Sequence, residues 1–102
     1  MAKLVVIYGK PTDAAAFDRH YADIHVPIAR QIPGLRDYEV SKGAVMTPAG
    51  PAEAHLIATL IFDDMAAIQA AFASPEGQRA AADVQNFATG GAQMLMFETE
   101  AV

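Results

Sequence analysis

The chemistry that this sequence can support centres on His25 and two side chains that precede it. If residues 13–31 form a helix, Asp18, Tyr21 and His25 follow an i, i+3, i+7 pattern and share one helix face. An imidazole at the boundary of a core titrates near neutral pH and can act as a general acid or base. Tyr21 can donate a hydrogen bond to a substrate, and Asp18 can orient one ring nitrogen of His25. We therefore take His25, Tyr21 and Asp18 as the candidate catalytic residues.

A structural role for His25 is the competing interpretation. Pro27 lies inside the helical pattern and lacks the N–H that would bond the carbonyl of Asp23, so a kink or a break into two segments is expected there. His25 can pack beside this kink and satisfy a local carbonyl. Residue type and spacing alone favour this structural role over catalysis.

The other histidines give no support for a metal site. His20 and His25 are five residues apart, which is about 140° around an α-helix, so an intact α-helix cannot direct both at one metal. His20 is expected at the boundary or the surface, and His55 opens a strand where it either points into the cavity or flanks a loop. Because the chain has no cysteine, disulfides, thiolate metal sites and cysteine nucleophiles are excluded. We expect neither a metal nor a cofactor.

Few other polar residues point to a function. Asp83 and Asn86 precede the last predicted strand and can reach the mouth of an open sheet face, but roles at a helix end and a turn are favoured for both. Gly90 and Gly91 lack the spacing of a phosphate-binding loop. The methionines are expected to fill gaps in the core.

Four strands and two helical regions are predicted to position these residues. The apolar strands are those whose residues are hydrophobic on both faces, and they cover residues 3–9, 55–62 and 92–98. Residues 35–45 read as a polar strand anchored by Tyr38 and Val40, which suits a sheet edge. Residues 46–54 carry two prolines and a glycine and are predicted to be a loop. The second helical region is predicted in two pieces, one capped by Asp63 and Asp64, and one that begins at Ser74 and runs to residue 87.

This β-α-β-β-α-β order predicts an α+β, ferredoxin-like fold, with a four-stranded antiparallel sheet and both helices on one face. In the spatial order 4-1-3-2 the polar second strand lies at an edge. The three apolar strands would then leave a large apolar surface on the helix-free face, where an antiparallel sheet is usually wet. Something outside the protomer must cover that face.

Composition limits the partners. The chain has 102 residues, of which 53% are hydrophobic, and a net charge of −5. This length predicts a single domain over residues 1–102. The negative charge argues against nucleic acid or an anionic membrane as a partner, and no apolar run approaches the ~20 residues of a membrane span. The N-terminus leads directly into a strand pattern without a signal peptide, so we expect a cytoplasmic protein.

The first helix carries a family resemblance. Residues 17–21 (FDRHY) followed by residues 25–29 (HVPIA) resemble the F-D-x-H-Y…H-x-P-[LI]-A signature of the EthD family, and residues 32–35 (IPGL) resemble its turn into the second strand. Residues 62–64, 74–77 and 86–87 are similar too, so the resemblance spans nearly the whole chain. It implies a dimeric α+β barrel, in which two ferredoxin-like protomers pair sheet to sheet as a homodimer. His25 then matches the motif histidine and Tyr21 its aromatic partner.

The family is named after a protein encoded beside a cytochrome P450 system for ethyl tert-butyl ether degradation. Its superfamily includes muconolactone isomerase, cofactor-free quinone-forming monooxygenases, polyketide cyclases and haem-dependent members. The resemblance thus implies an enzyme, or an auxiliary to oxidative catabolism, that takes a small apolar or aromatic compound into the cleft between helices and sheet. A cofactor-free isomerase, cyclase or monooxygenase is an alternative. A second alternative is a non-catalytic carrier that serves a partner oxygenase. A haem or metal protein with His25 or His55 as ligand is the least favoured.

Overall fold

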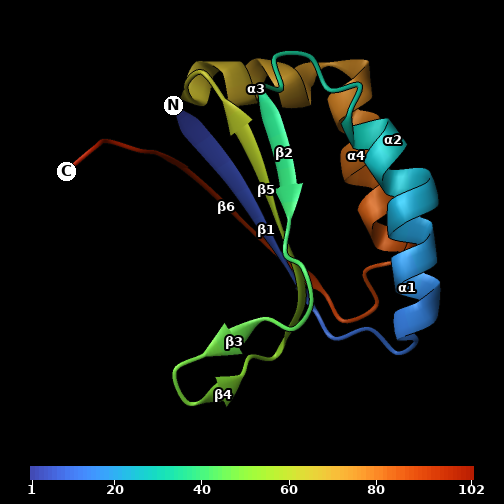
Figure 1. Ribbon diagram of the computed structural model, residues 1–102. Coiled ribbons are helices and arrows are strands. Elements are labelled where there is room, and N and C mark those ends of the chain that lie inside the picture. The colour runs from blue at the N-terminus through green and yellow to red at the C-terminus, as the bar shows by residue number, and fades with distance from the viewer.

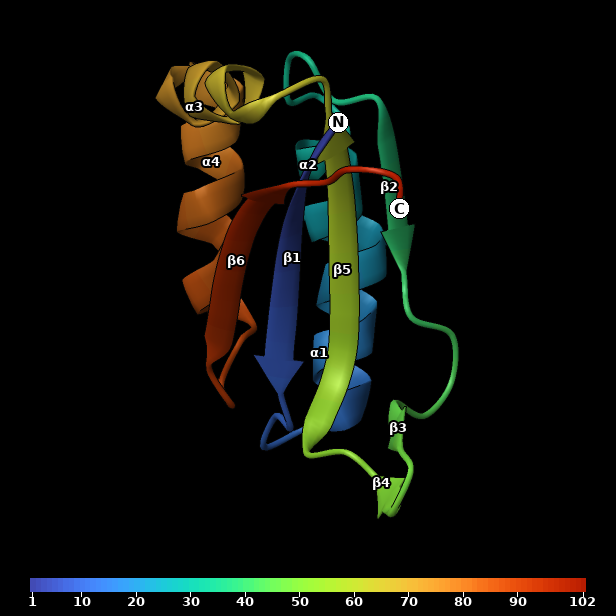
Figure 2. The ribbon, with the colours of Figure 1, turned by 90° about the vertical axis from the view of Figure 1, so that its left-hand side faces the viewer.

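The computed structural model describes residues 1–102 and contains the predicted four-stranded antiparallel sheet. Its strands are β1 (Ala2–Gly9), β2 (Asp37–Val40), β5 (Ala54–Phe62) and β6 (Ala92–Glu98), in the order β2-β5-β1-β6. Figure 2 shows the two long strands β1 and β5 in the centre and the short β2 at one edge. The ferredoxin-like fold and the edge position of the polar strand are therefore confirmed.

All helices lie on one side of this sheet (Figure 1). The first is continuous and consists of α1 (Ala14–His20), a π-helical turn η1 (Tyr21–His25) and α2 (Val26–Ala29). The second region consists of α3 (Met65–Ala73), which crosses the upper end of the sheet, then α4 (Pro75–Asp83) and the 3-10 turn η2 (Val84–Asn86). Asp13, Asp64 and Ser74 cap the helices as their side chains accept from backbone N–H groups. None of these helices combines the length and apolar character needed to cross a membrane.

The core fills the space between the helices and one face of the sheet. Along β1, the residues Leu4, Val6 and Tyr8 are buried and alternate with half-buried neighbours, as the two-residue period of a strand requires. Phe17 of α1 and Ile68 of α3 pack onto this face, and the full buried cluster holds 15 residues. Burial of a large apolar side chain is worth about 1.5–3 kcal/mol, so this cluster holds the two helical regions against the sheet.

The helix-free face of the sheet is apolar and uncovered in the protomer. The register pairs Val5 with Leu95 and Thr59, so alternate residues of neighbouring strands share this face. Every residue of β6 is exposed. The large apolar residues on the uncovered face are Val5, Ile7, Ile57, Ile61, Leu95 and Phe97. The strand pattern alone left both faces equivalent, and the structure assigns the odd-numbered residues to the uncovered one.

Two local predictions need correction around the second strand. The strand predicted over residues 35–45 is shorter, because β2 covers only Asp37–Val40. The segment predicted as a loop over residues 46–54 contains a small hairpin of β3 (Met46–Thr47) and β4 (Gly50–Pro51), which projects from the lower end of the sheet in Figure 1. Its turn is closed by the Thr47 hydroxyl, which donates to the carbonyl of Gly50 at 2.8 Å.

Candidate functional site

The site begins with the π-helical turn in the first helix. The N–H of Val26 bonds the carbonyl of Tyr21, five residues back, instead of the carbonyl four residues back that an α-helix would use. Pro27 follows at once and has no N–H to donate, so the predicted interruption takes the form of this wider turn rather than a break. Residues five apart lie one above the other in a π turn. His20 and His25 therefore face the same side, contrary to the α-helical angle expected from the sequence.

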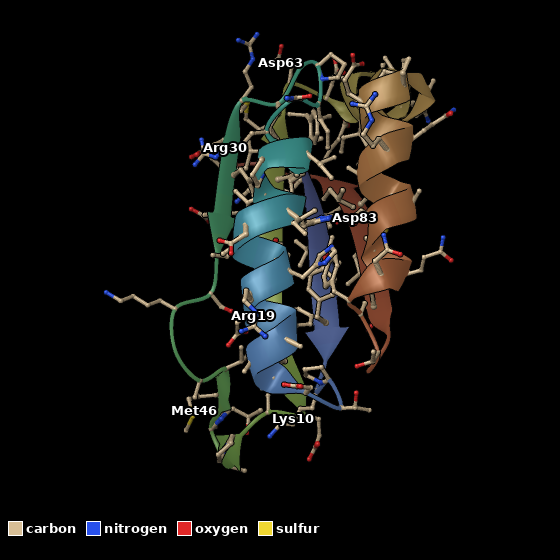
Figure 3. All side chains as sticks on the ribbon, turned by 90° about the vertical axis from the view of Figure 1, so that its right-hand side faces the viewer. Lys10, Arg19, Arg30, Met46, Asp63 and Asp83 are labelled. Atoms are coloured by element: carbon tan, nitrogen blue, oxygen red, sulfur yellow. The ribbon has the colours of Figure 1, made fainter.

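Both histidines converge on Asp83, the last residue of α4. His25 Nδ1 lies 2.9 Å from Asp83 Oδ2, and His20 Nε2 lies 3.0 Å from Asp83 Oδ1. Asn86 Nδ2 donates to Asp83 Oδ1 at 3.0 Å. Figure 3 shows Asp83 between the first helix and α4. His25 and Asp83 are buried, with only 6% and 7% of their surface exposed.

The protonation states of Asp83 and His25 determine which ring nitrogen of His25 carries the proton. Burial acts to raise the pKa of Asp83, but hydrogen bonds from Asn86, His25 and His20 outweigh it and hold that pKa below its usual range. Burial lowers the pKa of His25, and the adjacent Asp83 offsets part of this effect. Near neutral pH, Asp83 is therefore a carboxylate and His25 is neutral. A carboxylate only accepts, so the proton of His25 lies on Nδ1 and Nε2 keeps its lone pair.

His25 forms part of the wall of a cavity between the helices and the sheet. Fourteen of the fifteen lining residues are hydrophobic and His25 is the exception. His25 lines the cavity, its Nδ1 is held by Asp83, and its Nε2 makes no hydrogen bond. The cavity has a volume of about 30 Å³, which is room for about two water molecules, so a ring-sized ligand requires the lining side chains to move apart.

Three tyrosines supply the remaining polar atoms of the cavity wall. Tyr21 from η1 lies beside His25, with ring centroids 5.2 Å apart, and its hydroxyl is 2.5 Å from that of Tyr38 on β2. Tyr8 on β1 packs edge-on against Tyr21, with centroids 5.7 Å apart. Burial raises the pKa of Tyr8 and of Tyr21, and the neighbouring Tyr38 raises both further. These phenols therefore stay protonated and can act as donors at neutral pH.

The residues predicted from the sequence divide between two places. His25 and Tyr21 lie together in the cavity wall, as their spacing suggested. The prediction that Asp18 orients His25 was wrong, because Asp83 occupies that position. Asp18 is exposed and lies 2.8 Å from Nε2 of His55 instead.

His55 reaches the first helix because of a bulge in β5. Tyr8 pairs with Leu56 but Gly9 pairs with Ala54, so His55 is the extra residue. Its ring turns toward α1, where it meets the Phe17 ring edge-on with centroids 4.7 Å apart. This side chain therefore lies at the end of the helix layer and is not part of the cavity wall.

Four residues of the site were missed or undervalued in the sequence. Asp83 and His20 complete the hydrogen-bonded cluster, and Tyr8 and Tyr38 complete the polar part of the cavity wall. One signal for Asp83 was present, because an acid in the last turn of a helix is disfavoured by the helix dipole and calls for another reason to be there. No group of three histidine, aspartate or glutamate side chains is arranged to hold a metal ion.

Comparison with known proteins places this geometry in a family. The EthD domain model matches residues 10–91. An uncharacterized 11.0 kDa protein of the thcB-thcC intergenic region of Rhodococcus erythropolis is 44% identical over 102 residues, which cover all of this chain and 98% of that protein. The crystal structure of an ethyl tert-butyl ether degradation (EthD) family protein from Bacillus halodurans is 34% identical with a TM-score of 0.90, over 98% of this chain and 99% of that one.

More distant structures share the fold alone. SnoaB from Streptomyces nogalater, a cofactor-independent oxygenase, aligns with a TM-score of 0.69 over 99% of this chain and 94% of its own, at 14% identity. Two further ferredoxin-like proteins of unknown function, at 16% and 14% identity, are described as dimeric.

Proposed function

This chain belongs to the EthD family, and we propose that it binds a small, mainly apolar compound in its cavity and moves a proton on that compound through His25. The observation that carries this proposal is the orientation of the imidazole. Asp83 holds Nδ1 at 2.9 Å, and Nε2 makes no hydrogen bond on a ring that lines an apolar cavity. A neutral imidazole whose other nitrogen is fixed by a carboxylate is suited to general acid–base catalysis.

The surroundings of His25 fit this role. Burial lowers the pKa of His25 and so keeps the imidazole neutral. The base is therefore available at neutral pH. When Nε2 takes a proton, the carboxylate of Asp83 stabilises the imidazolium that forms. Phe87 packs against both histidines, with ring centroids 4.8 Å from His25 and 5.2 Å from His20, and so restricts the movement of both rings. No step of this proton transfer requires a cofactor.

Family membership suggests the metabolic setting. We place the reaction in the oxidative breakdown of ethers or aromatic compounds in the cytoplasm, as an auxiliary to an oxygenase. A cofactor-free isomerisation, cyclisation or oxygenation would each begin with the same removal of a proton from the substrate.

The proposed functional unit is a homodimer formed through the helix-free face of the sheet. Six large apolar side chains lie on that face, and Leu95 and Phe97 are 43% and 42% exposed in the protomer. An exposed apolar patch of this kind is typical of a protein interface. A second copy of the same sheet matches it in chemistry and strand length.

The test of this function is the exchange of ligand protons with solvent. Ethers, phenols and quinones are screened for binding, and uptake of deuterium from D₂O into the acidic α-C–H positions of cyclohexanone is followed by NMR. General acid–base catalysis contributes about 10²–10⁴-fold, so His25→Gln is expected to slow exchange at least about 100-fold. His55→Gln is the matched control, because His55 also pairs with an aspartate but lies outside the cavity. Unchanged exchange in His25→Gln would make His25 a structural residue.

A non-catalytic carrier is the second candidate, and the hydrophobic lining of the cavity favours it. Such a lining binds an apolar compound without chemistry and would shield it for a partner oxygenase. A carrier predicts binding in the same screen with no solvent exchange above the uncatalysed rate, and with equal affinity in wild type and His25→Gln.

A further inference from the structure

The hydroxyl of Tyr8 is a polar group of the cavity wall that has no role in the proton transfer described above. Tyr8 is 99% buried, at 1% exposure, and its hydroxyl makes no hydrogen bond. Tyr8 lines the same cavity as His25; burial raises the pKa of its phenol, which lies near enough to Tyr38 and Asp83 for both to raise that pKa further. An O–H without a partner in an apolar site is costly unless a ligand or a water accepts from it.

The Tyr21–Tyr38 pair adds a second donor to the same wall. The two hydroxyls are 2.5 Å apart, so one of them donates to the other. The accepting hydroxyl keeps its own hydrogen, and both tyrosines line the cavity. Burial raises the pKa of Tyr8, Tyr21 and Tyr38, so none of the three becomes a base at neutral pH.

The polar inventory of the cavity is therefore one acceptor and two donors in a hydrocarbon wall. The acceptor is Nε2 of His25, and the donors are Tyr8 and the free hydroxyl of the pair. An acceptor takes a proton and the donors stabilise the negative charge left on an oxygen, as in an oxyanion site. A hydrocarbon can form a hydrogen bond neither with the acceptor nor with the donors. An ether can accept from the donors only, because it has no acidic proton to give to the acceptor.

On this basis we infer that Tyr8, together with the Tyr21–Tyr38 pair, forms an oxyanion site, and that the substrate is a small phenol or enolisable ketone. This inference rests on the proposed function of His25 and adds the class of substrate to it. In the phenol, Nε2 gains the proton and the O–H electron pair stays on the oxygen. In the ketone, the C–H pair becomes the C=C bond of an enolate and the carbonyl π pair moves to oxygen. Tyr8 donates to that oxygen in both cases, and no oxidant is consumed.

This chemistry also gives the compound a place in a reaction sequence. A phenol or ketone arises when an oxygenase or a dehydrogenase introduces or oxidises oxygen on an apolar skeleton. The protein then acts on the oxygenated product and not on the ether or hydrocarbon from which it was made.

The experiment compares phenol, anisole and toluene as ligands, because they share one ring but offer this wall an O–H and an oxygen acceptor, an oxygen acceptor alone, and no polar group, respectively. Calorimetry is expected to give about fivefold tighter binding for each added hydrogen bond, with phenol first and toluene last. Tyr8→Phe should weaken phenol and anisole by about that factor and leave toluene unchanged. Toluene is thus the control within the same variant, and Tyr8→Phe should fold normally since the hydroxyl has no partner to lose.

The outcomes separate the inference from the function on which it rests. If toluene binds as tightly as phenol, or if Tyr8→Phe leaves the preference intact, the oxyanion site is refuted while an apolar binding cavity stands. If none of the three compounds binds, both the proposed function and this inference fail. Exchange of the α-protons of cyclohexanone in D₂O should slow in Tyr8→Phe as well as in His25→Gln. Exchange at the wild-type rate in Tyr8→Phe alone would also overturn the role of Tyr8.

Discussion

Replacement of Asp83 by alanine tests how firmly the carboxylate holds the site. Asp83 accepts hydrogen bonds from His25, His20 and Asn86 at 2.9–3.0 Å, and its side chain is only 8% exposed. Asp83→Ala leaves the buried N–H of His25 without an acceptor, which costs about 1–3 kcal/mol, and also removes two bonds to a charged group. His20 and Asn86 lie nearer the surface and can bond water instead.

One effect works in the opposite direction. Asp83 is the last residue of α4, where the helix dipole disfavours a negative charge. Removal of this charge stabilises the helix end by about 0.3–1 kcal/mol. Because water replaces the bonds of His20 and Asn86, the penalty at His25 less this gain leaves a net loss in the free energy of unfolding of about 1–2 kcal/mol. Urea denaturation at fixed protein concentration measures it, because a dimer would make stability depend on concentration.

Asp18→Ala is the matched control for this measurement. Asp18 also pairs with a histidine, at 2.8 Å, but its side chain is 62% exposed. Exposed ion pairs are worth about 0–1 kcal/mol, so this variant should lose less stability than Asp83→Ala. A loss of under about 1 kcal/mol in Asp83→Ala, or equal losses in the two variants, would refute the view that the carboxylate organises the site.

Three further predictions concern pH, assembly and packing. The pKa of His25 is lower in the folded chain than in the unfolded chain, where it is about 6.5. The free energy of unfolding should therefore be highest above pH 6.5 and fall as the pH drops toward the folded pKa. The urea midpoint should decrease between pH 7 and pH 5, and it should decrease less in His25→Asn. Val5→Glu on the helix-free face should give a monomeric mass by analytical ultracentrifugation, whereas Ile24→Glu, at an apolar position 47% exposed on the first helix, should not; equal masses would contradict the interface. A Cβ on Gly77 would lie 2.0 Å from the carbonyl oxygen of Ala71, so Gly77→Ala should cost about 1–3 kcal/mol or more in thermal or urea unfolding, and an unchanged midpoint would argue against this close contact of α3 and α4.

The fold could be predicted because it depends on periodicities that the sequence carries openly. The alternation of Leu4, Val6 and Tyr8, and the polar character of residues 35–45, determined the strands and the edge. The prediction was less accurate where chain geometry departs from the standard periods. The π turn before Pro27 places His20 on the same side of the helix as His25, and the bulge in β5 directs His55 toward α1.

The site could be predicted only in part, because its main interaction joins distant residues. His25 and Asp83 are 58 positions apart, and Tyr21 and Tyr38 come from different elements. Helical spacing pointed to Asp18 as the partner, since it considers only residues on the same helix. The choice of Asp83 depends on the packing of α4 against the first helix, which no local pattern reports.

In the proposed mechanism His25 is a neutral base that Asp83 holds at Nδ1 and that meets its ligand through Nε2. The most direct measurement is the ¹⁵N NMR spectrum of the imidazole of His25 near neutral pH, recorded with and without phenol. We expect a protonated Nδ1, an unprotonated Nε2, and a change in the Nε2 resonance when phenol binds. A doubly protonated ring, a proton on Nε2, or a spectrum unaffected by bound phenol would contradict this mechanism.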